Sequence, residues 1–327
     1  MRTKFLVFVT IIYCSSLLSQ NSYKKSFVSM GSSFEITVTA KNKEKGYYYI
    51  DLAINEITRI EKLISSWDKD SQTSKINNYA GIKPVIVDLE LFDLINRSIK
   101  ISELTKGAFD ISYASMDKVW FFDKQMESFP NSEIIKKSIQ KVGYDKIILD
   151  SRKSSIYLKD SGMKISFGAI GKGYAADKAK ELLINEGIKS GIINASGDLN
   201  AWGKQKNGKD WMVAITNPLN TKKVYSWLPI NNSSVATSGN YEKFIKFNDK
   251  VYSHIIDPRT GYPSEGILSV SVFCKTAELS DALATSIFVM GIETGLDLIN
   301  QLKGVECIII DNKNNIIKSN KIELYKI

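Results

Sequence analysis

The segment Ser166-Phe-Gly-Ala-Ile-Gly-Lys-Gly-Tyr-Ala-Ala-Asp177 follows the apolar run Met163 to Phe167 and leads into alanines and leucines at helical spacing. This pattern predicts a strand, a glycine-rich junction, and a helix that continues to about Glu186. Glycines let a backbone approach a ligand closely, and the free amides of a helix start favour phosphate oxygens. Lys172 adds a positive charge there. Because the spacing of a P-loop is absent, the junction alone fits a tight turn equally well.

Outward from this junction, strand-like and helix-like segments alternate without a clean domain break. Phe34 to Thr39 alternates apolar and polar residues, which predicts a half-buried strand, and isoleucines from Ile50 to Ile64 predict a long amphipathic helix.

Residues 69–80 are polar and contain turn formers. We also expect helices at about 89–105, 130–141, 277–290 and 293–302, and strands at about 147–149, 155–158, 188–194, 211–216, 225–230, 252–256 and 268–274. Hairpin-like pieces favour an α+β fold of one domain, with mixed, largely antiparallel sheets and packed helices.

The first twenty residues have the pattern of an export signal. Arg2 and Lys4 form a basic start, and the apolar run from Phe5 to Ile12 is too short to span a bilayer. We therefore expect a signal peptide at 1–20 and the functional domain at 21–327. A lipid tether at Cys14 is the alternative, which bulky Tyr13 disfavours.

Charge and cysteine content exclude several classes of protein. The net charge of +9 becomes +7 once Arg2 and Lys4 are removed, and the lysines are scattered among acids. This favours a solvated basic surface over nucleic-acid binding, so no nucleic-acid partner is expected, while an anionic ligand remains compatible. Cys274 and Cys307 lie in apolar runs, where cysteine usually behaves as a small buried hydrophobe, and they imply no zinc or redox site.

The only histidine of the chain opens the segment His254-Ile-Ile-Asp-Pro-Arg-Thr-Gly-Tyr-Pro263, which contains two of the six prolines. An imidazole, a carboxylate and a guanidinium thus stand in one stretch that ends in turn-forming residues. A neutral imidazole can accept a proton near pH 7. For Asp257 and Arg259 we favour a structural role, in which they pair and lock the loop.

A second chemical pair lies in the expected helix at 277–290. Asp281 and Thr285 are four residues apart and share one face of that helix. Together with a backbone carbonyl and waters they would suit Mg²⁺, which prefers hard oxygen ligands. The same residues also fit a capping aspartate and a threonine bonded back to its own helix.

Two further segments, Val235 to Glu242 and Asn194 to Asp198, are polar turns at strand ends by composition. In combination, however, the segments resemble the ApbE family of FAD:protein FMN transferases. The resemblance rests, in order, on segments 166–177, 194–198, 236–241, 254–263 and 281–285, with 30–34, 66–68 and 107–110 upstream.

This resemblance implies an exported, Mg²⁺-dependent enzyme with FAD as its substrate. Such an enzyme cleaves the FAD pyrophosphate, attaches FMN through a phosphoester to a Thr or Ser of a target protein, and releases AMP. The implied partners are flavin-accepting subunits of membrane redox complexes. The implied location is the periplasm, with attachment to the inner membrane left open.

The resemblance also assigns residues. It implies catalytic roles for His254 and Asp281, with His254 as general base or as the group that orients the acceptor hydroxyl. The implied metal ligands are Asp281, Thr285 and the carbonyl of Ala169. The residues implied to surround FAD are Met30, Trp67, Ala108, Phe109, Asp110, Ser166, Lys172, Thr237 and Ile256.

The chain departs from the family pattern at three positions. Ser166 and Asn240 stand where many relatives carry aspartate, and Trp67 stands where tyrosine is frequent, which preserves a stacking surface. The same residues are also compatible with two other functions. One is hydrolysis of FAD, with water in place of the protein hydroxyl, and the other is flavin binding without turnover.

Overall fold

An eight-stranded antiparallel sheet forms the centre of the protein in this computed structural model, which describes residues 21–123, 126, 128–240, 244–247 and 250–323. The strand order is β1-β2-β6-β7-β10-β13-β14-β15. These strands are β1 (Asn21–Ser29), β2 (Ser32–Ala40), β6 (Gly191–Ala195), β7 (Asp198–Trp202), β10 (Ser233–Gly239), β13 (Ile267–Cys274), β14 (Glu306–Asp311) and β15 (Ile316–Lys318). The expected α+β class with largely antiparallel pairing is confirmed.

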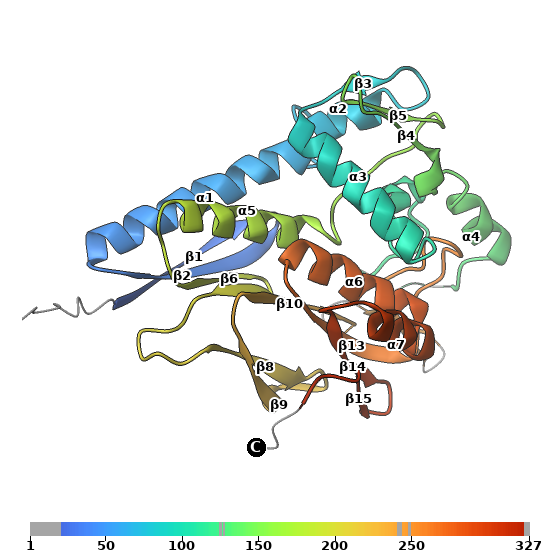
Figure 1. The fold of residues 1–327 in the computed structure, drawn as a ribbon. Helices are drawn as coiled ribbons and strands as arrows, with labels where there is room; N and C mark the ends of the chain where they lie inside the picture. Colours follow the sequence, from blue (N-terminus) through green and yellow to red (C-terminus); the bar gives the residue numbers. More distant parts are fainter. Residues whose placement is uncertain (1–20, 124–125, 127, 241–243, 248–249, 324–327) are drawn as a thin grey trace, which may run out of the picture.

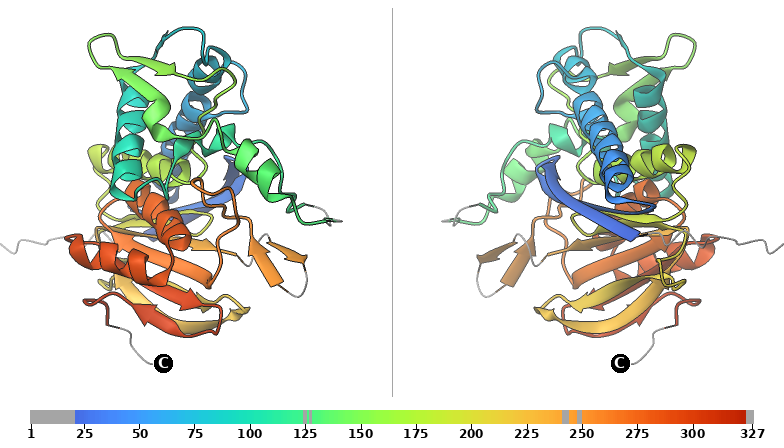
Figure 2. Two further views of the ribbon diagram at one scale, coloured as in Figure 1. Left: turned by 90° about the vertical axis from the view of Figure 1, so that its right-hand side faces the viewer. Right: turned by 90° about the vertical axis from the view of Figure 1, so that its left-hand side faces the viewer.

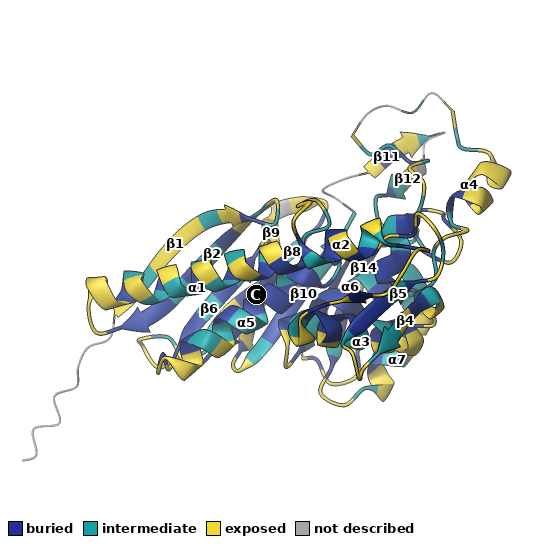
Figure 3. Cartoon of the chain, turned by 90° about the horizontal axis from the view of Figure 1, so that it is seen from above, coloured by how far each residue is buried: buried dark blue, intermediate teal, exposed yellow. Residues whose placement is uncertain are grey.

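Helices cover one face of this sheet (Figure 1). The helices that lie against the sheet are α1 (Lys43–Ile64), α5 (Gly171–Asn185), α6 (Ala277–Met290) and α7 (Ile292–Gln301). The other helices are α2 (Gln72–Asn78), α3 (Leu89–Leu104) and α4 (Ser132–Ser138), with short 3₁₀ turns at Ile111–Ser115 and Tyr144–Lys146. In α1 the fully buried Ile50, Ile57 and Ile60 form a stripe toward the core, which is the face that their spacing predicts. Figure 3 shows this helix exposed on its outer side and buried toward the sheet.

The opposite face of the sheet is covered by a separate hairpin of β8 (Trp211–Asn217) and β9 (Asn220–Ile230), as the side views in Figure 2 show. Its residues Val213, Ile215 and Leu228 pack against Val235 of β10 and Ile308 of β14. The protein therefore has two apolar layers, one on each face of the sheet.

Two small sheets complete the fold. One consists of β3 (Val85–Ile86), β5 (Ser155–Leu158) and β4 (Ile147–Asp150), and the other of β11 (Phe244–Phe247) and β12 (Lys250–Ser253). Ile245 of β11 packs with Trp120, Ile135 and Ile256 in a separate cluster that leads to the His254 segment.

Most expected elements are present, with several differences. The polar stretch 69–80 contains α2, whose start is capped by Ser71, and residues 198–202 form β7, although no strand was expected there. Residues 21–29 form β1, and α4 ends at Ser138 instead of continuing to Lys141. Cys274 and Cys307 are buried and unpaired, as expected. The expected signal peptide and Cys14 lie outside the described residues.

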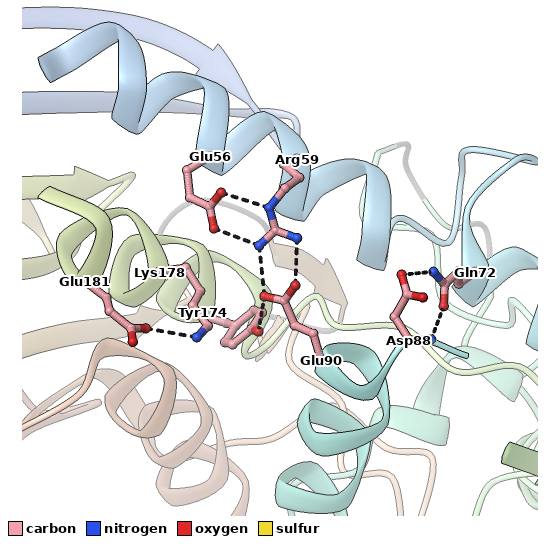
Figure 4. Close-up of polar contacts among 8 residues, drawn as sticks. All are labelled: Glu56, Arg59, Gln72, Asp88, Glu90, Tyr174, Lys178 and Glu181. Carbon is pink, nitrogen blue, oxygen red and sulfur yellow. Dashed lines mark hydrogen bonds and ion pairs between the residues drawn. The ribbon is translucent and has the colours of Figure 1, made fainter. Parts of the chain in front are cut away.

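A polar cluster ties the three helices α1, α3 and α5 together on the outer side (Figure 4). Arg59 of α1 donates to both oxygens of Glu90, at 2.7 and 3.0 Å, and the buried Tyr174 of α5 donates to Glu90 at 2.7 Å. The hydrogen bonds from Arg59 lower the pKa of Glu90 below its ordinary value of 4.5. The carboxylate of Glu90 thus links α3 to both α1 and α5.

Replacing Glu90 with glutamine should lower the free energy of unfolding by about 1–2 kcal/mol, because the buried hydroxyl and the guanidinium lose an ionised acceptor. Since the pKa of Glu90 is depressed in the folded state, its contribution is present above pH 4.5 and is lost as the pH falls through the folded pKa. Urea unfolding of both proteins at about pH 7 and at acid pH measures this difference.

Glu181→Gln is the matched control, because Glu181 makes only an exposed ion pair with Lys178. Such a pair is worth less than about 0.5 kcal/mol. A loss in Glu90→Gln that equals the control, or that grows toward acid pH, would contradict the role given to Glu90.

Candidate active site

All thirteen site residues named from the sequence line one cleft, with a volume of about 1070 Å³, on the helix-covered side of the main sheet. They come from segments far apart in the chain, which the fold brings together in space. The residues are Met30, Trp67, Ala108, Phe109, Asp110, Ser166, Ala169, Lys172, Thr237, His254, Ile256, Asp281 and Thr285.

The glycine-rich junction lies along one side of this cleft. The run Met163 to Phe167 is not a strand, because its backbone bonds to side chains: Asn77 pairs with both the amide and the carbonyl of Ile165, at 2.8 and 3.0 Å. Two amides at the helix start are also occupied, since Gly171 donates to the carbonyl of Phe167 and Gly173 donates to Asp281 Oδ2. These two amides are thus not free for phosphate oxygens, and Lys172 is the charged group of the junction at the cleft.

Lys172 lies between two buried carboxylates. Its Nζ is 2.9 Å from Asp198 Oδ2 and 3.5 Å from Asp281 Oδ2, and the two aspartates are only 3% and 4% exposed. Burial alone would lower the pKa of Lys172, but attraction by Asp281 and Asp198 outweighs it and raises this pKa. Burial and repulsion from Asp281 raise the pKa of Asp198. With both aspartates ionised, the cluster has more negative than positive charge.

The donor set around Asp281 fits a small hard cation. Thr285 lies one turn further along α6, and its hydroxyl is 3.1 Å from that of Ser238 on β10, so it does not bond back to its own helix. Asp281 bonds across to Lys172 and Gly173 instead of capping α6. Neither residue therefore has the capping or back-bonding role that the sequence left open.

Two further observations bear on the kind of cation. Asp198 Oδ2 is buried and makes no hydrogen bond within the described part of the chain, although Lys172 Nζ is close. Among the described residues, no three His, Cys, Asp or Glu side chains form a metal site by themselves. A cation here would need hydroxyl, carbonyl or water oxygens as well, which is the coordination that Mg²⁺ prefers. Ala169, whose carbonyl is the third expected donor, lines the same cleft.

His254 follows directly after β12 and is held by a rigid loop. Asp257 accepts three hydrogen bonds from Arg259, at 2.8, 2.8 and 2.9 Å, and its carbonyl accepts from Gly261. Gly261 has a φ of +76°, and its carbonyl accepts from Trp120 Nε1 at 2.8 Å. The Asp257–Arg259 pair therefore locks the loop, as expected, next to His254, whose side chain lines the cleft.

The far end of the cleft has aromatic and apolar walls. Trp67 is 95% exposed, so its indole is available to stack on a planar ring, while Ala108 and Phe109 are buried beneath the surface. Asp110 has mainly a structural role, because its carboxylate accepts from the amides of Ser112 and Tyr144. Burial raises the pKa of Asp110.

The departures from the family pattern have different structural consequences. Ser166 remains at the cleft, where it accepts from the hydroxyl of Ser66 at 3.3 Å. Asn240 instead bonds to the backbone of β13, through its amide to Leu268 and its side chain to Ile267. Ser166 thus still lines the cleft, whereas Asn240 is not among its lining residues.

Sequence reasoning missed two carboxylates of the site, Asp198 and Glu61. The turn at 194–198 is a two-residue hairpin connection between β6 and β7, as its composition indicates, but the aspartate that ends it points to Lys172. The sequence signal that could have identified Asp198 is its position as an acidic residue at the start of a run, Asp198 to Trp202, that alternates like a strand. Glu61 had no such signal, because it occupies an ordinary polar position of α1.

A cleft that combines an ion-paired lysine, oxygen donors and one histidine is typical of an enzyme that acts on an anionic substrate. The model of the ApbE family matches residues 30–309, and the chain belongs to this family.

Relatives and solved structures agree with this assignment. The FAD:protein FMN transferase of Klebsiella pneumoniae (strain 342) is 29% identical over 299 residues, covering 91% of this chain and 92% of that protein. The Escherichia coli (strain K12) protein of the same name is 30% identical over 247 residues, covering 74% and 70%. The crystal structure of the ApbE protein of Thermotoga maritima has a TM-score of 0.83 at 28% identity, covering 92% of this chain and 97% of that one.

The contact between α5 and α6 that builds the charge cluster depends on Gly173. A Cβ at this position would lie 2.2 Å from the carbonyl oxygen of Ala277, which is backbone and cannot rotate away. Gly173→Ala should therefore lower the free energy of unfolding by about 3 kcal/mol. Chemical denaturation measures the loss.

Gly168→Ala provides the control at the same junction, because nothing lies within 4 Å of a Cβ there. We expect this variant to unfold within about 0.5 kcal/mol of the wild type. Equal stability of the two variants would show that the close approach of α5 and α6 is not a constraint.

Proposed function

We propose that this chain is an FAD:protein FMN transferase that uses Mg²⁺ to move FMN from FAD to a Ser or Thr hydroxyl of a target protein. Membership of the ApbE family and the shared name of its relatives support the transferase activity. The observation that carries the chemical part is the position of Lys172 between Asp198 and Asp281, in the cleft that His254 also lines.

The reaction is a displacement at phosphorus. The acceptor hydroxyl oxygen forms a bond to the phosphorus of the FMN half of FAD, and the bridging P–O bond to the AMP half breaks with its electron pair leaving on AMP. His254 takes the proton of the attacking hydroxyl as general base. Lys172 balances negative charge on the phosphate oxygens. Trp67 and the apolar wall hold the flavin ring in place.

Asp281, Thr285 and the carbonyl of Ala169 would hold Mg²⁺, which supplies charge neutralisation of the pyrophosphate when bound. A divalent cation suits this end of the cleft, because the two buried carboxylates exceed the single ammonium in charge when both are ionised, and a bound cation would favour their ionised forms. The hydroxyl of Thr285 lies on the same face of α6 as Asp281, as the metal assignment requires.

The partner and the location follow from the same proposal. The acceptor is a flavin-carrying subunit of a membrane redox complex, and the enzyme acts in the periplasm after export, either free or tethered to the inner membrane. Within the described residues, the structure contains no helix that is long and apolar enough to cross a membrane.

The mass of a flavin-accepting domain after incubation with the protein, FAD and Mg²⁺ tests the proposed function. We expect a covalent FMN adduct on a Ser or Thr together with free AMP. AMP and free FMN without an adduct would instead show FAD hydrolysis, and intact FAD would show binding without turnover.

Asp281→Ala should lower the turnover number at saturating Mg²⁺ by at least about 100-fold, because a ligand of the charge-neutralising cation is lost. Asp297→Ala is its control, since Asp297 is an exposed aspartate of α7. Wild-type turnover in Asp281→Ala would reject the metal assignment.

His254→Gln should lower the turnover number by about 100-fold, because an amide cannot act as general base. The dissociation constant for FAD, measured by quenching of flavin fluorescence, should stay within about twofold. A large loss of FAD binding with unchanged turnover would assign His254 to the ligand instead of the acceptor.

A further inference from the structure

The turn between β1 and β2 has an unfavourable backbone conformation at a residue of the cleft. Ser29 pairs with Ser32, so only Met30 and Gly31 connect the strands, and their φ angles are +51° and +67°. Two residues with positive φ are characteristic of a type I′ turn, for which Asn and Gly are the favoured residues. Glycine adopts this conformation freely, whereas methionine does not.

Glu61 holds this turn from α1. One oxygen of its carboxylate accepts from the amide of Met30 at 2.7 Å, and the other accepts from the hydroxyl of Ser29 at 2.7 Å. Both oxygens are thus used on two consecutive residues of the turn. Bonds to an ionised carboxylate are among the stronger hydrogen bonds in proteins, so they can offset the strain at Met30. Met30, Gly31 and Glu61 all line the cleft.

The same end of α1 also places the opposite aromatic wall. Ser65 follows the last residue of the helix, and its hydroxyl accepts from the amides of Trp67 and Asp68, at 3.2 and 3.0 Å. Glu61 and Ser65 are one helical turn apart. The position of Met30 relative to Trp67 is therefore set by a few residues of one rigid helix.

We infer that Glu61 is a positioning residue for the flavin end of the cleft. It keeps Met30 in a left-handed conformation, so that the methionine side chain starts from a fixed backbone position in the cleft that Trp67 also lines. This inference rests on the proposed function, because FAD supplies the ring. Glu61 does not touch the reacting phosphate, so its role is in substrate binding.

Glu61→Ala should raise the dissociation constant and the KM for FAD about tenfold and change kcat less than about twofold. The reason is that the turn at Met30 would no longer be ordered before FAD binds, which weakens binding but leaves the chemical step unchanged. Glu61→Gln should have a smaller effect, since the amide oxygen can still accept one of the two bonds. In both variants amide hydrogen exchange at Met30 should accelerate, and this measurement needs no FAD.

Glu56→Ala is the matched control, because Glu56 is a carboxylate on the same helix that bonds to Arg59 away from the cleft. It should leave FAD affinity and Met30 exchange unchanged. Unchanged exchange in Glu61→Ala, or a loss in kcat at constant KM, would overturn the inference while the proposed function stands. If wild-type protein bound no FAD, the proposed function would fail, and the exchange data would still decide whether Glu61 holds the turn.

Discussion

The pairing of Lys172 with Asp198 and Asp281 is the interaction on which the site depends. The ammonium of Lys172 is half-buried and the two carboxylates are buried, and such charges are tolerated in a fold only when they compensate one another, because each unpaired buried charge would cost several kcal/mol in lost hydration. The three residues come from α5, from the start of β7 and from α6. Forming this cluster therefore requires the helix layer and the sheet to meet at one point.

A second interaction next to this cluster keeps the two helices together. Asp177 of α5 accepts hydrogen bonds from the amides of Ala277 and Glu278, at 2.9 and 2.8 Å. These amides lie at the N-terminus of α6, where they have no partner within the helix, and Asp177 precedes them by about a hundred residues in the sequence. Burial raises the pKa of Asp177 to about 6, although these amides favour its ionised form. Burying the Asp177 carboxylate is therefore unfavourable in itself. Its hydrogen bonds nevertheless fix the N-terminus of α6, the helix that carries Asp281 and Thr285.

Local patterns predicted the elements and the residue types of the site, but not its internal contacts. The apolar spacing of Ile50 to Ile64 and the composition of residues 277–290 were sufficient to locate α1 and α6, because a helix face is visible in one sequence window. Met163 to Phe167 was wrongly predicted as a strand, since an apolar run does not show that Asn77 will take its hydrogen bonds. Asp198 and Glu61 were missed because their partners lie on other elements.

We propose that the carboxylate end of the cleft is a site for a divalent cation. Diffraction from crystals grown with Mn²⁺ as a substitute for Mg²⁺, recorded for its anomalous signal, tests it most directly. We expect a peak at about 2.2 Å from oxygens of Asp281 and Thr285, near the longer end of the distances typical of small divalent cations. A crystal that contains Mn²⁺ elsewhere and none beside Asp281, with Lys172 still paired to both aspartates, would contradict it.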